Sequence, residues 1–160
     1  MNIDLLIKEA TLAKNGSAKE AYRAIKSELL LNESSKNPKS EGKEIAKFKF
    51  KYSGDEFEIY INELDLSIIR KLVREREESI SMYEANSRKD LADIYRDQIK
   101  YLKELLPSEI SKEQIEEFIV SAFPNGFPKK EMGFVIKETK NTFPTADGKL
   151  ISEIVKSHIN

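Results

Sequence analysis

The middle of the chain constrains the fold most, because it holds two long amphipathic segments separated by a short polar break. From about Asp65 to Ala85, apolar residues recur every three or four positions, which is the spacing of one helix face. A second segment of this kind follows Ser87 and ends at Pro107, a residue that does not continue a helix. Two helices with so short a connection pack as an antiparallel hairpin. The chain is therefore predicted to be mainly α-helical.

Three serines precede apolar periodic segments with the spacing of a capping box, in which each side chain binds a free backbone N–H. Each spacing predicts the start of a helix. The asparagine and glycine at positions 15 and 16 are expected to separate two N-terminal helices. The three pairs are Ser17 with Glu20, Ser87 with Asp90, and Ser111 with Gln114.

Residues from about 45 to 62 follow a different period. Apolar and polar residues alternate before and after a turn at Ser53-Gly54-Asp55, which predicts a β-hairpin inserted into the helical body. Phe48 and Phe50 share one face, and the lysines between them share the other. An isolated two-stranded hairpin is only marginally stable in water, so this one must lie on a helix or pair with another edge.

After Pro107 the sequence predicts three shorter helices separated by linkers at residues 124–128 and 141–148. Three helices of this size form a small bundle. We therefore expect a helical body with an inserted hairpin over residues 1–106 and a three-helix tail domain over residues 107–160.

Composition excludes several kinds of site. The 160 residues carry a net charge of −1, contain no cysteine and only one histidine, His158. Disulfides, zinc–thiolate sites and multi-histidine metal sites are therefore excluded. No glycine-rich phosphate loop, nucleophile elbow or pair of acid–base residues is visible. We therefore predict no cofactor and no metal, and no residues in the sequence support an enzymatic function. No apolar run is long enough to span a membrane and no signal peptide is evident, so a cytoplasmic location is expected.

Lysines in the last third are the first candidate binding residues. Residues 120–160 hold six lysines against four acidic residues, an excess that fits either a solvated face or contacts with RNA phosphates. Asp147-Gly148-Lys149 fits either a helix cap, with a glycine that lets the backbone approach a neighbour, or a phosphate seat at a helix N-terminus. The candidate residues are Lys129, Lys130, Lys137, Lys140, Thr145, Asp147, Gly148 and Lys149.

Cations in the body give two further candidates. Lys47, Lys49 and Lys51 on the hairpin suit either protection of a strand edge or contact with nucleic acid. Arg76 lies within the apolar stripe of its helix. It is interpreted either as a snorkelling arginine paired with a carboxylate of a neighbouring helix or as a phosphate contact.

Several stretches, in this order and at these spacings, resemble the YqeY-like protein family. They cover residues 22–29, 71–80, 88–92 and 105–107, then Met132-Gly133 and Ala146-Asp147-Gly148-Lys149-Leu150. The resemblance implies a helical body followed by a three-helix tail similar to the tail domain of the B subunit of the glutamyl/aspartyl-tRNA amidotransferase, which helps to hold tRNA. Phe134 and the Pro144-Thr145 pair depart from the family pattern, since polar or basic residues are usual there.

Two hypotheses follow. The first is a non-catalytic tRNA-associated module, linked to tRNA-dependent amidation, that binds RNA weakly through the tail. The second is a protein–protein adaptor that uses the charged long helices and the hairpin, whose free edge could also pair with a second copy of the chain.

Overall fold

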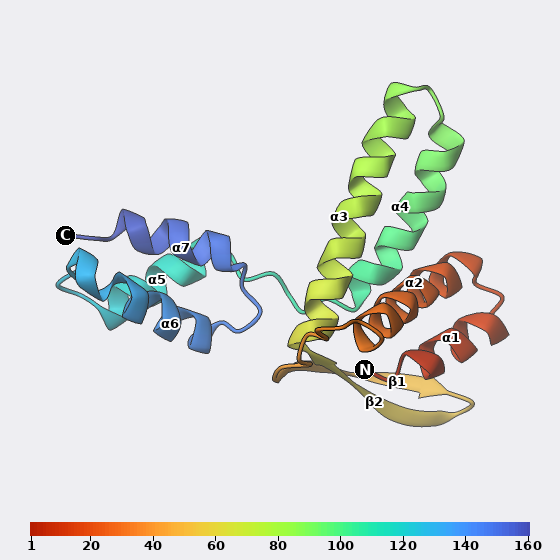
Figure 1. Ribbon diagram of the computed structural model, residues 1–160, viewed down its shortest axis with the longest axis horizontal. Helices are drawn as coiled ribbons and strands as arrows, with labels where there is room; N and C mark the ends of the chain where they lie inside the picture. The colour runs from red at the N-terminus through yellow and green to blue at the C-terminus, as the bar shows by residue number, and fades with distance from the viewer. The chain divides into compact units, whose positions relative to one another are not determined.

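The computed structural model describes residues 1–160, and these divide into two compact units, Met1–Leu106 and Pro107–Asn160, here called the body and the tail. Along the chain lie seven α-helices, one 3₁₀ turn and one pair of strands, as Figure 1 shows. The prediction of a mainly helical protein with an inserted β-hairpin is confirmed.

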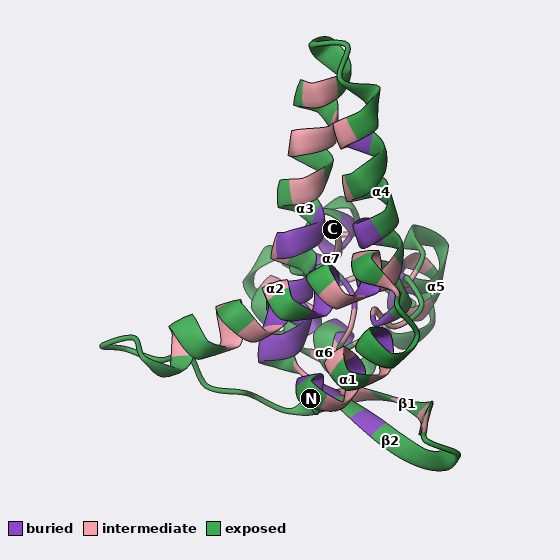
Figure 2. Cartoon of the chain, turned by 90° about the vertical axis from the view of Figure 1, so that its right-hand side faces the viewer, coloured by how far each residue is buried: buried purple, intermediate pink, exposed green.

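Four helices build the body: α1 (Ile3–Leu12), α2 (Gly16–Glu33), α3 (Glu63–Ala85) and α4 (Lys89–Glu104). α3 and α4 form the expected antiparallel hairpin, and α1 and α2 pack beside its lower half (Figure 1). Leu6, Ala21, Ile25, Ile69 and Leu102 are fully buried in the core that they share. Most buried positions of α3 and α4 lie near α1 and α2, whereas the far half of the hairpin is mostly exposed or half-buried (Figure 2).

The β-hairpin consists of β1 (Glu44–Tyr52) and β2 (Asp55–Asn62), which pair antiparallel. Its two-residue turn has positive φ at both Ser53 (51°) and Gly54 (84°), the conformation of the tight turns that match strand twist. Ile59 and Ile61 are buried, and Phe48 and Phe50 pack against the core of the body. The hairpin is therefore stabilised by the helices, as its marginal independent stability requires.

Two of the three predicted capping serines were wrong. α2 begins at Gly16, and the side chain of Asn15, not Ser17, accepts the N–H of Ala18 (3.1 Å). Ser87 has a φ of 56°, outside the extended region that an N-cap requires, because it belongs to the tight connection after α3. Only Ser111 caps its helix, through the complete capping box that the sequence predicted.

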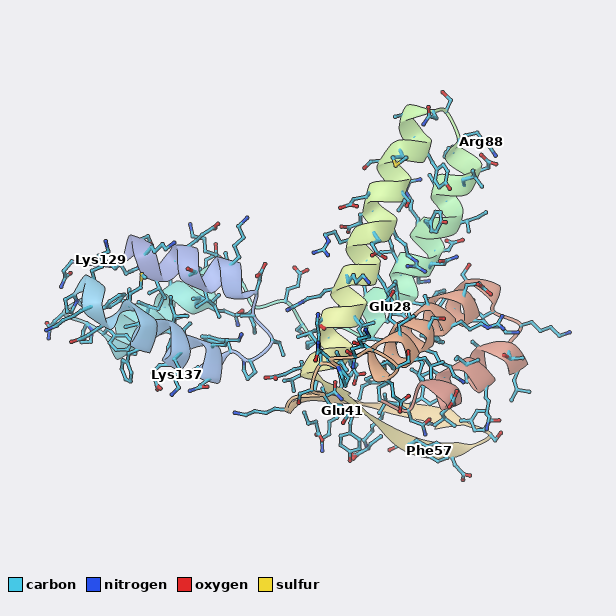
Figure 3. All side chains as sticks on the ribbon, in the orientation of Figure 1. Glu28, Glu41, Phe57, Arg88, Lys129 and Lys137 are labelled. Carbon is cyan, nitrogen blue, oxygen red and sulfur yellow. The ribbon has the colours of Figure 1, made fainter.

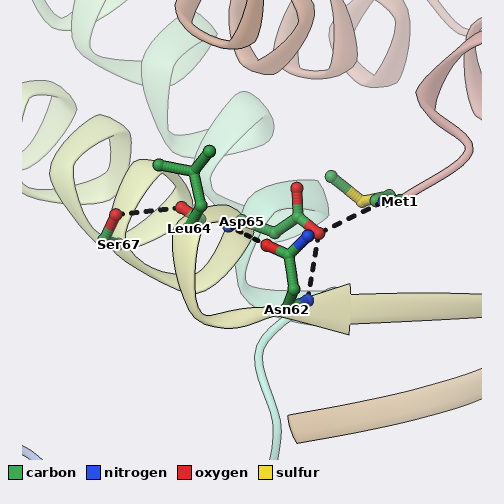
Figure 4. A network of polar contacts seen from close by, with 5 residues as sticks. All are labelled: Met1, Asn62, Leu64, Asp65 and Ser67. Atoms are coloured by element: carbon green, nitrogen blue, oxygen red, sulfur yellow. Dashed lines mark hydrogen bonds and ion pairs between the residues drawn. The ribbon is translucent and has the colours of Figure 1, made fainter. Parts of the chain in front are cut away.

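The start of α3 carries a capping box that the sequence analysis missed. Asn62 accepts the N–H of Asp65 (2.8 Å), and Asp65 Oδ2 accepts the N–H of Asn62 (3.0 Å), as Figure 4 shows. The terminal ammonium of Met1 lies 3.3 Å from the same carboxylate oxygen, and the Asp65 side chain is 1% exposed. The capping box moves the helix start to Glu63, two residues before the predicted one.

The tail contains α5 (Lys112–Ala122), the 3₁₀ turn η1 (Lys129–Glu131), α6 (Met132–Thr142) and α7 (Gly148–Ser157). Its core is separate from that of the body and consists of Ile115, Ile119, Phe127, Val135, Ala146, Ile151, Ile154 and Val155. Phe127 lies in the predicted linker but is only 1% exposed, so this loop contributes a large side chain to the core.

The two linkers of the tail begin with the same turn. Phe123 follows α5 and Phe143 follows α6, each with a proline next in sequence and a backbone N–H that donates to a carbonyl four residues earlier (2.9 Å in both). The φ and ψ angles are −129° and 64° at Phe123 and −121° and 72° at Phe143. In each turn the N–H three residues after the phenylalanine donates back to its carbonyl, from Gly126 and from Ala146.

Apolar residues spaced at helical period are expected to be buried, but some of them are exposed. These are Leu30 on α2, Ile94 on α4 and Ala122 on α5. Helical periodicity marks a stripe along the whole helix, but a residue is buried only where a neighbour reaches it. None of the helices combines the length and the hydropathy that crossing a membrane requires.

Candidate nucleic-acid interface

The five candidate lysines of the tail are exposed, and none of them forms an ion pair. They are Lys129, Lys130, Lys137, Lys140 and Lys149. The ion pair within the tail joins Lys112 of α5 to Glu116 at 3.6 Å. An exposed ammonium without a carboxylate partner keeps its charge available to an incoming anion.

The structure brings only some of these lysines together. Phe127, just before Lys129 and Lys130, lies beside the end of α7, because its carbonyl accepts the N–H of Asn160 (3.1 Å). Lys149, in contrast, lies at the beginning of α7, which is about 15 Å long. The 3₁₀ turn and α6 carry the remaining lysines along one helix, where Figure 3 labels Lys129 and Lys137. The candidates therefore form an extended series and not a single cluster.

Asp147 caps α7. Its carboxylate accepts the N–H of Lys149 (2.9 Å), so one of the free amides expected to bind a phosphate is already engaged by an acidic side chain. Gly148 lies in the first helical turn, and a Cβ at this position would meet no atom within 4 Å. The expectation that Gly148 allows a close backbone approach within the protein is therefore wrong. Thr145 is half-buried just before the cap.

The hairpin lysines differ from those of the tail, because two of the three are paired. Lys47 Nζ lies 3.8 Å from Glu58, and Lys49 Nζ lies 3.1 Å from Glu56. These glutamates belong to β2 and share the solvent face of the sheet with the lysines, while Lys51 forms no ion pair. Acidic residues beside the cations weaken the attraction of this face for phosphate.

Arg76 faces the interior of the α3–α4 hairpin. Its Nε donates to Gln98 Oε1 (3.0 Å), and its Nη1 donates to the carbonyl of Leu72 (3.4 Å). The predicted carboxylate partner was wrong, since the partner is the amide of Gln98. Burial lowers the pKa of Arg76 below its usual range. The guanidinium is thus bonded inside the body, which favours the structural interpretation over the phosphate contact.

Sequence analysis missed a cleft of about 410 Å³ in the body, lined by residues of α2, α3 and the segment between α2 and β1. Lys71 in this cleft donates to Glu28 (2.9 Å), which raises the pKa of Lys71, and it lies 3.9 Å from Glu75. Lys39 and Arg74 also line this cleft. These residues come from distant parts of the sequence, and no local motif indicates that they meet.

The chain was compared with known proteins. A family model described as YqeY-like protein matches residues 2–159, almost the full length. A search among curated proteins found no match. Because the match spans both the body and the tail, the whole architecture described above is covered by it, and the chain belongs to the YqeY-like protein family.

Proposed function

We propose that the tail binds tRNA, without catalysing a reaction on it, through the exposed lysines of the 3₁₀ turn, α6 and the start of α7. The observation that carries the proposal is the pairing of the lysines. Those of the tail site have no ion-pair partner, whereas two of the three on the hairpin are neutralised by glutamates. RNA phosphates are the natural counterions for such a series of ammonium groups.

The resemblance of the tail to the amidotransferase tail domain supports the same proposal. The stretches at Met132-Gly133 and Ala146–Leu150 are similar to those of the amidotransferase tail domain, which helps to hold tRNA. A link to tRNA-dependent amidation, and with it a cytoplasmic location, follows from this resemblance. In that setting the chain contributes contacts with tRNA and not chemistry.

The tail as a whole is not basic. Residues 107–160 contain seven lysines and eight acidic residues, so attraction to RNA must come from the local arrangement of the lysines. This arrangement predicts weak binding that depends strongly on salt. Each lysine–phosphate contact releases counterions from the RNA, and this release becomes less favourable as the salt concentration rises.

The test is fluorescence-anisotropy titration of the full chain against total tRNA at two salt concentrations. Lys137→Glu should weaken binding about 3- to 10-fold and reduce the salt slope by about 1. Lys112→Glu is the matched control, because it makes the same charge change in the same unit but at a lysine already paired with Glu116. Absence of binding at low salt, or equal losses in the two variants, would rule the proposal out.

A second charge reversal tests the seat at the start of α7. Lys149→Glu should weaken tRNA binding without unfolding the tail, which circular dichroism checks. Unchanged affinity in this variant would restrict the interface to the 3₁₀ turn and α6.

The alternative function is a protein–protein adaptor. The observation that favours it is the two-stranded sheet, because β1 and β2 pair only with each other and each keeps an unpaired outer edge. Phe57 and Tyr60 of β2 are 38% and 43% exposed. Addition of a strand from a partner or a second copy would satisfy such an edge. Sedimentation of the purified chain over a range of concentrations tests self-association.

A further inference from the structure

Phe134 of α6 is the most exposed aromatic side chain of the tail, at 57%. A single exposed apolar side chain is common on protein surfaces, so the exposure of Phe134 does not by itself indicate a ligand. The groups that surround the ring are what indicate one.

The Phe134 ring is held by other aromatic rings. It lies edge-to-face with Phe123, with centroids 6.4 Å apart and planes at 86°. Phe123 lies in turn 5.7 Å from Phe127, which is 1% exposed in the tail core. A series of three rings thus runs from the core to the surface. Such contacts restrict the outer ring and leave it pre-organised for a flat partner.

Lysines flank Phe134 on one side. α-Helical spacing places Gly133, Lys137 and Lys140 on one stripe of α6. Lys130 lies in the preceding 3₁₀ turn, three residues before Gly133. We call these three lysines the lysine stripe. All three are exposed and form no ion pair. Glu131 and Glu138 lie on the other side of Phe134 in the helical projection, so the stripe itself contains no acidic residue.

Gly133 leaves the surface beside Phe134 bare. It is exposed, and a Cβ at this position would meet no atom within 4 Å. Packing within the chain therefore does not require a glycine here, although a glycine destabilises a helix by about 0.5–1 kcal/mol relative to alanine. A bare backbone within the lysine stripe allows a ligand to approach the helix closely between the lysines.

We propose that Phe134 is a stacking platform for an unpaired RNA base, whose neighbouring phosphates are held by Lys130, Lys137 and Lys140. The proposal rests on the tRNA-binding function and deepens it. Aromatic rings interleaved with unpaired lysines bind single-stranded segments, because every base has a π-face and every nucleotide a phosphate. An apolar surface for a protein partner would not need an adjacent stripe of cations.

Two variants separate stacking from simple burial. Phe134→Leu keeps the apolar character but removes the ring, and it should weaken binding of total tRNA about tenfold. The same variant should bind a long RNA duplex as the wild type does, because bases inside a duplex stack on one another and only the two end pairs offer a free face. The chain contains no tryptophan, so Phe134→Trp introduces a single fluorophore whose emission a stacked base should quench. Val120→Trp is the matched control, since Val120 is 55% exposed on α5 of the same unit.

The outcomes distinguish the two proposals. Salt-dependent tRNA binding with a tenfold loss in Phe134→Leu and quenching only in Phe134→Trp supports the stacking platform. Binding that is unaffected by Phe134→Leu, with no quenching in Phe134→Trp, overturns the platform and leaves the tRNA-binding function standing. No tRNA binding by the wild type overturns both. A dimer in sedimentation that Phe134→Leu dissociates would place the ring in a protein contact and also overturn the platform.

Discussion

Tyr22 of α2 shows how a single buried group makes stability depend on pH. Burial, reinforced by Glu104 and Glu9, raises the pKa of its hydroxyl to about 12 from an ordinary value of 10.0. Below pH 10 the hydroxyl is protonated in both states, so this group adds no pH dependence. Between pH 10 and 12 the unfolded chain loses the proton while the folded chain keeps it, and the stability of the folded state falls as pH rises.

The comparison of wild type with Tyr22→Phe isolates this effect. The difference in free energy of unfolding between the two proteins should be constant below pH 10 and change between pH 10 and 12, with the wild type losing its advantage. Urea denaturation at several pH values measures it. A difference that stays flat through pH 12 would contradict the assignment, because other groups that titrate in this range are common to both proteins.

Single residues also show where sequence reasoning stops. The half-buried position of Arg76 follows from helical period, but its partner does not, since Gln98 is 22 residues away and becomes a neighbour only through the α3–α4 connection. Phe127 was assigned to a linker because prolines and a glycine surround it, and yet its side chain fills the core of the tail. Composition identifies a loop, but not which of its side chains point inward.

Among the elements, α3 depends on how it begins. The Asp65 carboxylate closes the capping box with Asn62 and lies beside the Met1 ammonium, and it is almost completely buried. Asp65→Ala removes both interactions and should destabilise the body by about 3 kcal/mol, a typical loss when one member of a buried ion pair is removed. Asp90→Ala at the start of α4 is the control, because Asp90 is exposed and pairs with Arg88 at the surface. Chemical denaturation measures the free energy of unfolding of both variants. Equal losses of this free energy would show that the burial of Asp65 contributes nothing to stability.

Elements could be predicted much better than their first residues. The sequence indicated the α3–α4 hairpin, the β-hairpin and the three helices of the tail, because hydrophobic period depends on many residues at once. An N-cap, in contrast, depends on only one or two residues. Ser111 is the N-cap because Gln114 completes its capping box, whereas Asn15 caps α2 in place of Ser17, and the turn after α3 places Ser87 in a left-handed conformation. An asparagine directly after a strand, followed by an acid three residues later, would have indicated the start of α3.

At the scale of the whole molecule, two separate cores predict that the body and the tail unfold independently. Ile69 belongs to the core of the body and Ile119 to that of the tail, and both are almost completely buried. Ile119→Val should destabilise the tail by about 0.5–1.5 kcal/mol and leave the body unchanged. Hydrogen exchange measured by mass spectrometry should show faster exchange in peptides of residues 107–160 alone. Ile69→Val is the reciprocal control, and faster exchange in both units from either variant would mean that they unfold together.

At this scale the sequence suggested a hypothesis of RNA binding but not which surface would make the contacts. A count of charges gives a slight excess of lysine over residues 120–160, but a count does not reveal which lysines are already paired. The pairs Lys47–Glu58 and Lys49–Glu56 result from strand register, and the contact of Phe134 with Phe123 joins α6 to the turn after α5. Both are tertiary properties, so the sequence alone could not distinguish the paired lysines of the hairpin from the unpaired lysines of the tail.

One turn occurs twice in the tail, and the residues that follow it differ in charge between the two places. The same phenylalanine–proline turn follows α5 and α6, yet the first leads into Lys129 and Lys130 and the second into Asp147 and Gly148. The backbone has the same conformation at Phe123 and Phe143, while two lysines follow the first turn, and an aspartate, a glycine and a lysine follow the second. The residues after either turn can therefore be exchanged while the turn itself is kept, which makes both positions suitable for grafting a new sequence in protein engineering.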